Sequence, residues 1–492
     1  MKDILISITL FFAFSFQLLG QQSVFKDSIL VAELQEDYKI LKEVLEEYHP
    51  GLYRYQDSTA IEKHFLDLEN ELNKSLSTTE FYLSLSRFTR KLKCGHTFCS
   101  YYNQPKIIQD SIFNQSDKVP FTFSLFEKQM VITKNLSGNN LLNKTQIISI
   151  NEVPVSTIID TLLTYVKGDG SNDGKRLKDL ELTGLGTFEA FDIYFPLLYP
   201  PIDSVYKLEA QKTGSDESFT VEIKLISRSE RLTRIEENYG KQASNYDELW
   251  SFEILDPKTA YLKLGTFVTY KMTLDWKKFL ADAFEEIESK NIPNLIIDIR
   301  DNEGGDEEVN LVLANHLAKK TIELPEYKEL LTYDVISDEL KPYLKTWDKS
   351  FYDRTDKVID LNNGFYTWKK ENTSKKIAKN ENAFSGDVFL LVNEANSSAT
   401  FFLAHLLQQN KMATIIGTET GGNLKGTNGG SMFFLRLPNS KIEIDIPLIG
   451  YYPTVEQVDK GLAPDIMVKK TIEDLITEKD IELEKVFEII NK

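Results

Sequence analysis

The chain has 492 residues, of which 41% are hydrophobic and 27% are charged. This length is sufficient for about two to four domains, each with a hydrophobic core of its own. The formal net charge of −18 argues against nucleic acid or an anionic membrane surface as a partner, because both are themselves negatively charged.

The first residues have the pattern of a secretory signal peptide. Lys2 precedes an apolar run over residues 4–19, and Gly20 and two glutamines follow it. The run is short for a bilayer span, and no second run of this kind follows in the sequence. No cysteine stands at the expected cleavage site, which argues against a lipid anchor. We therefore expect a signal peptide at residues 1–20 and an extracytoplasmic protein, periplasmic or secreted, without stable membrane insertion after its removal.

Residues 24–112 are expected to form an N-terminal helical domain. Apolar residues recur at helical spacing over residues 27–48 and again over residues 61–72. A third helix is predicted to begin at Ser77, where the letters STTE form a capping-box pattern. The predicted helices of this domain end at the letters CGHT, residues 94–97.

Cys94 and Cys99 are the only cysteines, and they flank His96. In an oxidising compartment the two thiols could form a local disulfide. The three residues could also suggest a metal site. Zinc takes four ligands in a structural site or three plus water in a catalytic one, and the sequence has no second Cys/His cluster. We therefore expect no metal ion.

Residues 113–228 have the alternating apolar pattern of strands from residue 121 onward. Residues 145–155 resemble the part of a PDZ domain in which a strand, a turn and a helix follow in order. The elements expected next are a helix over 158–166, a loop over 167–175 and a strand over 206–226. We interpret the region as a PDZ-like domain, with a small β-rich spacer as the alternative.

Residues 227–247 are polar and charged and are interpreted as a linker to a core at residues 245–470. Strands alternate with helices in this core, which predicts an α/β layer. The expected elements are a strand over 259–264, a helix over 275–290, strands over 295–300 and 388–392, a helix over 401–409, a strand over 413–416 and a hairpin over 433–447. Residues 321–385 interrupt the alternation as an insertion, either a lid or a surface excursion. Residues 471–492 are expected to contain a terminal helix, over residues 471–490.

Two stretches of the core carry residues suited to catalysis. A buried-type strand leads into the polar turn 393–398, so Ser397 and Ser398 lie at a strand-to-helix junction beside free backbone N–H groups of the helix start. Such a serine is well placed for acyl transfer, although both serines could merely cap the helix. A second buried strand leads into Gly304 and Gly305, whose backbone could approach an oxyanion.

Four motifs, taken together and in this order, resemble the carboxyl-terminal processing protease and tricorn core family of serine peptidases, which also has retinoid-binding-protein-like members. The motifs are DIRDNEGG (298–305), NSSA (396–399), IGTETGG (416–422) and GLAPD (461–465). The resemblance implies a crotonase-like αββ spiral core with PDZ-like and helical domains appended, and it implies no cofactor. It also implies Ser398 as the nucleophile and the N–H groups of Ala399 and of Gly304 or Gly305 as oxyanion donors.

The general base is interpreted as His96. CGHT resembles the Gly-His-Thr element that carries the base in tricorn-like members, whereas the other four histidines, His49, His64, His316 and His405, are expected to be structural. In the lysine version of the family a lysine lies 25 residues after the serine. That position is Asn423 here, with Lys425 only nearby. For the acid that steadies the histidine, Glu456 is our choice and Asp459 the alternative.

The sequence thus predicts an extracytoplasmic serine endopeptidase that acts on polypeptides through an acyl-enzyme. The resemblance implies cleavage near the C-termini of unfolded or tagged chains, captured by strand addition on the PDZ-like unit. A non-catalytic peptide- or ligand-binding protein on the same fold is the main alternative. An esterase is a second alternative, but no Gly-x-Ser-x-Gly elbow surrounds Ser398.

Overall fold

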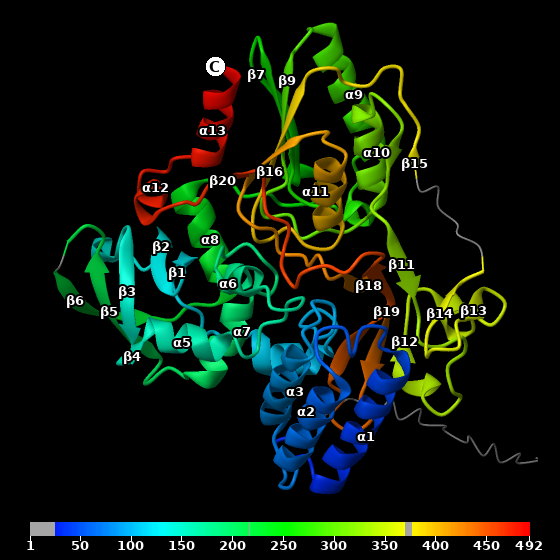
Figure 1. Ribbon diagram of the computed structural model, residues 1–492. Coiled ribbons are helices and arrows are strands. Elements are labelled where there is room, and N and C mark those ends of the chain that lie inside the picture. Colours follow the sequence, from blue (N-terminus) through cyan, green and yellow to red (C-terminus); the bar gives the residue numbers. More distant parts are fainter. Residues whose placement is uncertain (1–24, 216, 370–375) are drawn as a thin grey trace, which may run out of the picture.

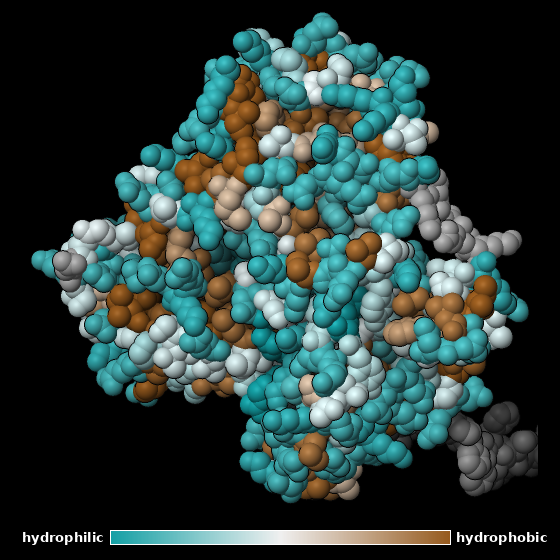
Figure 2. All heavy atoms as spheres, viewed as in Figure 1, coloured by the Kyte–Doolittle hydropathy of each residue, from teal (hydrophilic) through white to brown (hydrophobic). Residues whose placement is uncertain are grey.

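The computed structural model describes residues 25–215, 217–369 and 376–492. The signal peptide expected at residues 1–20 lies outside them. Within these ranges no helix has both the length and the apolar character needed to cross a bilayer. The face in Figure 2 is mostly hydrophilic, with smaller apolar areas between the charged side chains, as expected for a chain with 27% charged residues.

The N-terminal region is helical, as predicted. Its elements are α1 (Val31–Tyr48), α2 (Ser58–Glu71), α3 (Thr78–Lys91), α4 (Lys106–Ile108) and a π-helical turn (Gln109–Phe113). The capping box at Ser77 is confirmed, because its side chain accepts from the Glu80 N–H and Glu80 accepts from the Ser77 N–H in return. The amphipathic pattern thus correctly located the three long helices.

The middle region is built on an antiparallel sheet in the order β1-β2-β3-β5-β6, with β4 paired to β3. Its elements are β1 (Phe121–Phe126), β2 (Gln129–Asn135), β3 (Thr145–Ile150), β4 (Val153–Pro154), α5 (Val155–Leu162), α6 (Asp173–Leu180), α7 (Ala190–Leu198), β5 (Val205–Lys212) and β6 (Ser218–Lys224). The strand, turn and helix expected from residue 145 are present. The single strand expected over 206–226 is wrong, because this segment folds as the hairpin β5–β6.

The linker predicted over residues 227–247 is also wrong. Residues Arg228–Tyr239 form α8, which packs on the middle region through Ile235 and Arg231, both with 0% exposed area. The Arg231 guanidinium is buried because it pairs with Asp192 through both terminal nitrogens. A buried ion pair looks polar in the sequence, which is why composition suggested an exposed linker.

The core contains a second, mostly parallel sheet in the order β20-β17-β16-β9-β8-β7 (Figure 1). Its strands are β7 (Trp250–Asp256), β8 (Thr259–Leu264), β9 (Asn294–Asp298), β16 (Asp387–Val392), β17 (Thr414–Gly417) and β20 (Ile466–Met467). Helices α9 (Trp276–Ser289), α10 (Glu308–Leu317) and α11 (Ala399–Gln409) share one hydrophobic cluster with one face of this sheet. The other face packs against α13 (Ile481–Ile490). Strands buried on both faces explain the continuous apolar runs.

The C-terminal helix predicted over residues 471–490 is two helices, α12 (Ile472–Ile476) and α13. Asp480 accepts from the Leu483 N–H and starts α13 as a new helix. The helical period continues across this break, so it did not reveal the interruption.

The insertion at residues 321–385 enlarges a third sheet, in the order β11-β19-β18-β12. The hairpin of β18 (Thr427–Arg436) and β19 (Glu443–Pro453) was predicted, and the insertion adds β11 (Tyr327–Leu330) and β12 (Leu344–Lys345) at its two edges. The insertion also contains the short strands β10 (Ile322–Glu323), β13 (Val358–Asp360), β14 (Tyr366–Trp368) and β15 (Lys376–Ile377). Most of the insertion therefore extends or covers a sheet.

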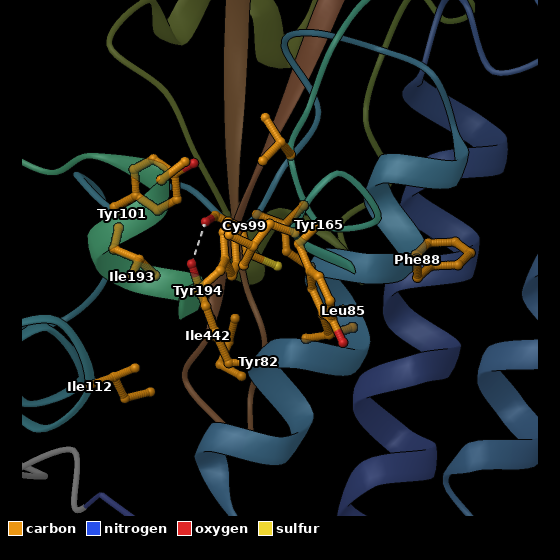
Figure 3. Close-up of a cluster of buried hydrophobic side chains, with 14 of the residues drawn as sticks. Tyr82, Leu85, Phe88, Cys99, Tyr101, Ile112, Tyr165, Ile193, Tyr194 and Ile442 are labelled. Carbon is orange, nitrogen blue, oxygen red and sulfur yellow. Dashed lines mark hydrogen bonds between the residues drawn. The ribbon is translucent and has the colours of Figure 1, made fainter. Parts of the chain in front are cut away.

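The helical region, the middle region and the β18–β19 hairpin share one hydrophobic core. Figure 3 shows part of it, where Tyr82 and Leu85 of α3 lie near Tyr194 of α7 and Ile442. The Tyr82 hydroxyl donates to the carbonyl oxygen of Cys99 at 3.2 Å. This shared core holds the segment 94–99 against the hairpin and thereby brings the N-terminal helical region to the C-terminal half of the chain.

Candidate active site

The turn between β16 and α11 presents Ser398 in a strained backbone conformation. Ser398 has φ 51° and ψ −127°, a left-handed geometry that a residue with a side chain rarely adopts and that costs about 1–3 kcal/mol. Its hydroxyl makes no capping hydrogen bond, although Ser398 occupies the N-cap position of α11. Ser397, by contrast, donates its hydroxyl to the carbonyl oxygen of Glu303 at 3.1 Å. Ser398 is thus the serine whose hydroxyl is not used in the turn.

Side chains of the same turn tie it to the glycine loop 301–305. The Asn396 amide donates to the carbonyl oxygens of Ile299 and Asn302 at 2.5 Å and 3.0 Å. Thr400 donates its hydroxyl to the carbonyl oxygen of Asn302 at 2.9 Å. These buried bonds stabilise the strained turn and set the distance between the serine and the glycines.

Gly304 and Gly305 lie directly beside the serine, with φ of 111° and 139°. A Cβ added to Gly304 would come within 3.0 Å of the Ala399 nitrogen, so a side chain cannot be accommodated there. The Gly304 N–H donates to the Asn302 side chain at 2.9 Å and is occupied. The Gly305 N–H has no acceptor among the described residues, and Ala399 is the first residue of α11, where N–H groups have no acceptor within the helix.

His96 lies where the helical region meets β18 of the hairpin. Its Nε2 would be 3.9 Å from a Cβ built on Gly429, and its buried Nδ1 has no hydrogen-bond partner among the described residues. Burial lowers the pKa of His96, the carboxylate of Asp169 opposes this, and Lys167 and Lys175 lower the pKa further. The imidazole is therefore neutral near pH 7 and able to accept a proton.

A cavity of about 70 Å³ joins these parts of the chain. Its lining residues are Gly95, His96, Lys167, Gly168, Asp169, Lys175, Asp179, Glu303, Ser397 and Gly421. The cavity thus brings together the histidine of the helical region, the loop before α6, the glycine loop 301–305 and the turn before α11. The described structure shows no hydrogen bond between the side chains of Ser398 and His96.

Asp169 is the carboxylate whose charge raises the pKa of His96, and from the sequence it was expected only to be part of a loop. Asp169 is 2% exposed and accepts from the Gly95 N–H at 2.8 Å and the Thr427 hydroxyl at 3.0 Å. Its signal in the sequence was weak, because aspartate next to glycine is ordinary loop composition. Asp169 is recognised as part of the site only through its contacts with the distant Thr427 and with Gly95 of the CGHT segment.

The acids considered from the sequence lie elsewhere. Glu456 is exposed, and its carboxylate has no hydrogen-bond partner among the described residues. Asp459 accepts from the N–H and hydroxyl of Ser171, both at 2.9 Å, and from the Asn423 amide at 2.7 Å. Asp459 therefore ties loops together beside the cavity, whereas Glu456 is not brought to His96.

The remaining histidines have structural contacts. His49 bonds Thr97 at 2.8 Å, His64 bonds Gln56, His316 stacks on Phe284 and His405 bonds Tyr327. Lys425, the lysine near the position of the lysine version, is not among the described residues that line the cavity.

The two cysteines are both free and buried, so the local disulfide is not formed in this structure. The thiol sulfur of Cys94 accepts from the Asn428 amide at 3.3 Å. The described residues contain no group of three or more His, Cys, Asp or Glu side chains arranged to hold a metal ion.

Comparison with known proteins gives a family match for part of the chain and a likeness of fold for nearly all of it. Residues 258–468 match the model of peptidase family S41. The structure of mature CPAF complexed with lactacystin is similar with a TM-score of 0.65 and 14% identity, over 94% of this chain and 98% of that one. A second crystal structure of mature CPAF has a TM-score of 0.61 and 15% identity, over 93% and 96% of the two chains. At such identities the likeness concerns the fold alone. No curated protein matches the sequence.

Proposed function

We propose that residues 258–468, which match the model of peptidase family S41, form a serine-type peptidase domain with Ser398 as its nucleophile and His96 as its general base. The observation that carries the proposal is the turn at Ser398. Its hydroxyl is unused, its backbone is strained, and two glycines and a helix N-terminus lie beside it. Such a turn positions a nucleophile next to N–H groups that can bind an oxyanion.

In the proposed mechanism the Ser398 oxygen attacks the carbonyl carbon of the scissile peptide bond. The neutral His96 accepts the hydroxyl proton and then donates it to the leaving amine. Water subsequently hydrolyses the acyl-enzyme with the same histidine as base. Hydrogen bonds between catalytic groups are often long without substrate, so we expect Ser398 and His96 to approach when a substrate closes the site.

The oxyanion is proposed to bind between the N–H groups of Ala399 and Gly305. Gly304 is the less suitable of the two glycine donors, because its N–H already donates to Asn302 at 2.9 Å. The role of Gly304 is then to permit close approach, since a Cβ there would meet the Ala399 nitrogen. Preorganised donors of this kind contribute about 10²–10³-fold each to kcat.

Asp169 is the carboxylate that we propose to stabilise the protonated imidazole. It is buried, lines the same cavity as His96 and raises the pKa of His96. Its two hydrogen bonds also hold Gly95 next to Thr427 and so position the histidine. Glu456 stays a prediction from the resemblance, and it would have to move from its exposed position to reach the ring.

The substrate class is polypeptide, as the family implies. We propose a crotonase-like core and a PDZ-like middle region that captures an extended peptide by adding it to a sheet edge. The order of β3, β4 and α5 supports the PDZ-like interpretation. The apolar run after Lys2 supports an extracytoplasmic location.

A non-catalytic binding protein is the second candidate, favoured by the missing hydrogen bond between Ser398 and His96. A fluorophosphonate probe separates the two, because it labels only an activated serine. We expect mass spectrometry to find the label on Ser398. We also expect Ser398→Ala to lose at least about 10³-fold in peptide cleavage while Ser397→Ala, the matched neighbour, loses far less. Wild-type protein that neither takes the label nor cleaves peptides would support a binding protein instead. Equal activity of Ser398→Ala would show that another residue is the nucleophile.

A further inference from the structure

We infer that two lysines of α6, Lys175 and Lys178, are positioning residues that hold the glycine loop 301–305 in the geometry needed for oxyanion binding. This inference rests on the proposed function of that loop. Helix α6 belongs to the middle region and lies outside residues 258–468, so the peptidase-matching region does not contain it.

Each lysine pairs with one carboxylate of its own helix region and one of the loop. Lys175 contacts Asp179 at 2.6 Å and Glu303 at 3.3 Å. Its side chain is only 8% exposed. Burial alone would lower the pKa of Lys175, but Asp179 and Glu303 raise it above its ordinary value, so the ammonium stays charged. The buried lysine is thus retained by its two carboxylates rather than by solvent.

Lys178 repeats this arrangement one turn further along α6. It contacts Glu181 at 2.8 Å and Asp301 at 3.0 Å. Asp301 also accepts from the Asn393 amide at 2.9 Å, so it is held between α6 and the nucleophile turn. The spacing of three residues places both ammonium groups on one face of the helix, toward the loop.

The loop needs external support because Asp301 has φ 65°, which is strained for a residue with a side chain, and because Gly304 and Gly305 have no side chains that could fix their backbone. The contacts to Asn396 and Thr400 secure its first residues, up to the carbonyl of Asn302. The side chain of Glu303, which immediately precedes the glycines, is held by Lys175. Without the lysines the two carboxylates would also place uncompensated negative charge beside a developing oxyanion.

Helix α6 is itself fixed to the core, so it can serve as a support. The Asn172 amide donates to the carbonyl oxygens of Thr420 and Gly422, both at 2.9 Å, and its oxygen accepts from the Lys175 N–H at 3.2 Å. A helix anchored at its start and paired along one face transmits its position to the loop. The middle region therefore contributes directly to the peptidase site.

The test compares Lys178→Met with a matched control. Lys178 is the preferred position because its side chain is 26% exposed, and removing it opens no cavity in a core. Lys128 pairs with Asp160 at 2.6 Å on the surface of the same region, and Lys128→Met serves as the control. For each full-length variant, kcat and KM are measured on a peptide substrate, and the melting temperature is recorded.

We expect Lys178→Met to lower kcat by roughly 10- to 100-fold, with KM within about twofold, because a misplaced oxyanion donor acts in the transition state. Lys178→Arg, which keeps the charge and the reach, should recover most of kcat, and Lys128→Met should match the wild type. The double variant Lys178→Met/Asp301→Asn should lose no more than Lys178→Met alone, because the two residues act as one unit.

Unchanged kcat in Lys178→Met, a loss expressed only in KM, or fully additive losses in the double variant would overturn the inference. If Lys178→Met does not fold, Lys178→Gln replaces it with the same expectations. Failure of the proposed function has a different signature, namely a wild-type protein without cleavage or fluorophosphonate labelling, or retained cleavage by Ser398→Ala. The two failures are therefore distinguishable in one set of assays.

Discussion

Replacement of Asp169 by asparagine tests the part of the site that the fold revealed and the motifs did not. Asparagine has the same shape, and its oxygen can still accept from the Gly95 N–H. The Thr427 hydroxyl, which donates to Asp169, can instead accept a hydrogen bond from the asparagine amide nitrogen. The main loss is therefore the negative charge near the imidazole. We expect a folded protein that has lost about 1–2 kcal/mol of stability, because one charge-assisted bond becomes neutral.

The effect on the rate follows from Coulomb's law. For charges about 4–8 Å apart at an effective dielectric constant of about 20, a carboxylate stabilises an imidazolium by about 2–4 kcal/mol. Because the imidazolium exists only after proton transfer, this energy is lost mainly from the transition state. It corresponds to a decrease in kcat of about 30- to 10³-fold.

The pH profile distinguishes loss of the charge from a structural defect, because only loss of the charge shifts the pKa of His96 in a defined direction. Asp169 raises the pKa of His96, so its removal lowers that pKa further. The acid limb of kcat/KM should shift to lower pH in Asp169→Asn although the plateau falls. Glu456→Gln is the control and should leave both plateau and limb near the wild-type values, since Glu456 is exposed. An unchanged plateau in Asp169→Asn, or a large loss in Glu456→Gln, would refute the assignment and favour Glu456.

Two further predictions concern the base and the fold. The wild-type kcat/KM should rise through one ionisation below the ordinary histidine value of about 6.5, because burial lowers the pKa of His96; a profile that still climbs above about pH 9, with inactivation by Lys425→Ala, would instead indicate a lysine base. Arg231→Ala should destabilise the protein by about 3–5 kcal/mol in denaturant unfolding, because it leaves the buried Asp192 without its partner; a loss below about 1 kcal/mol would show that this pair is solvated.

Local chemistry explains what could be predicted from the sequence. The continuous apolar run 388–392, the polar turn and the apolar helix identified the turn of the proposed nucleophile, because a strand buried on both faces and a helix start each have a short-range signature. Glycines after a buried strand likewise identified the loop at Gly304 and Gly305. The capping box at Ser77 was confirmed for the same reason, since all its contacts lie within four residues.

The tertiary structure alone decided which distant groups complete the site. The role proposed for Asp169 depends on its contacts with Thr427 and with the segment of His96, and the role proposed for Lys178 depends on its contact with Asp301. Arg231 is buried in an ion pair with Asp192 of another helix. Its charge therefore led to the wrong prediction of an exposed linker over residues 227–247. Charged side chains carry no periodic signal, and their partners are set by docking between regions far apart in the chain. The sequence by itself therefore determined the turns that hold the proposed reacting groups, and the packing of the middle region against the core determined which charges surround them.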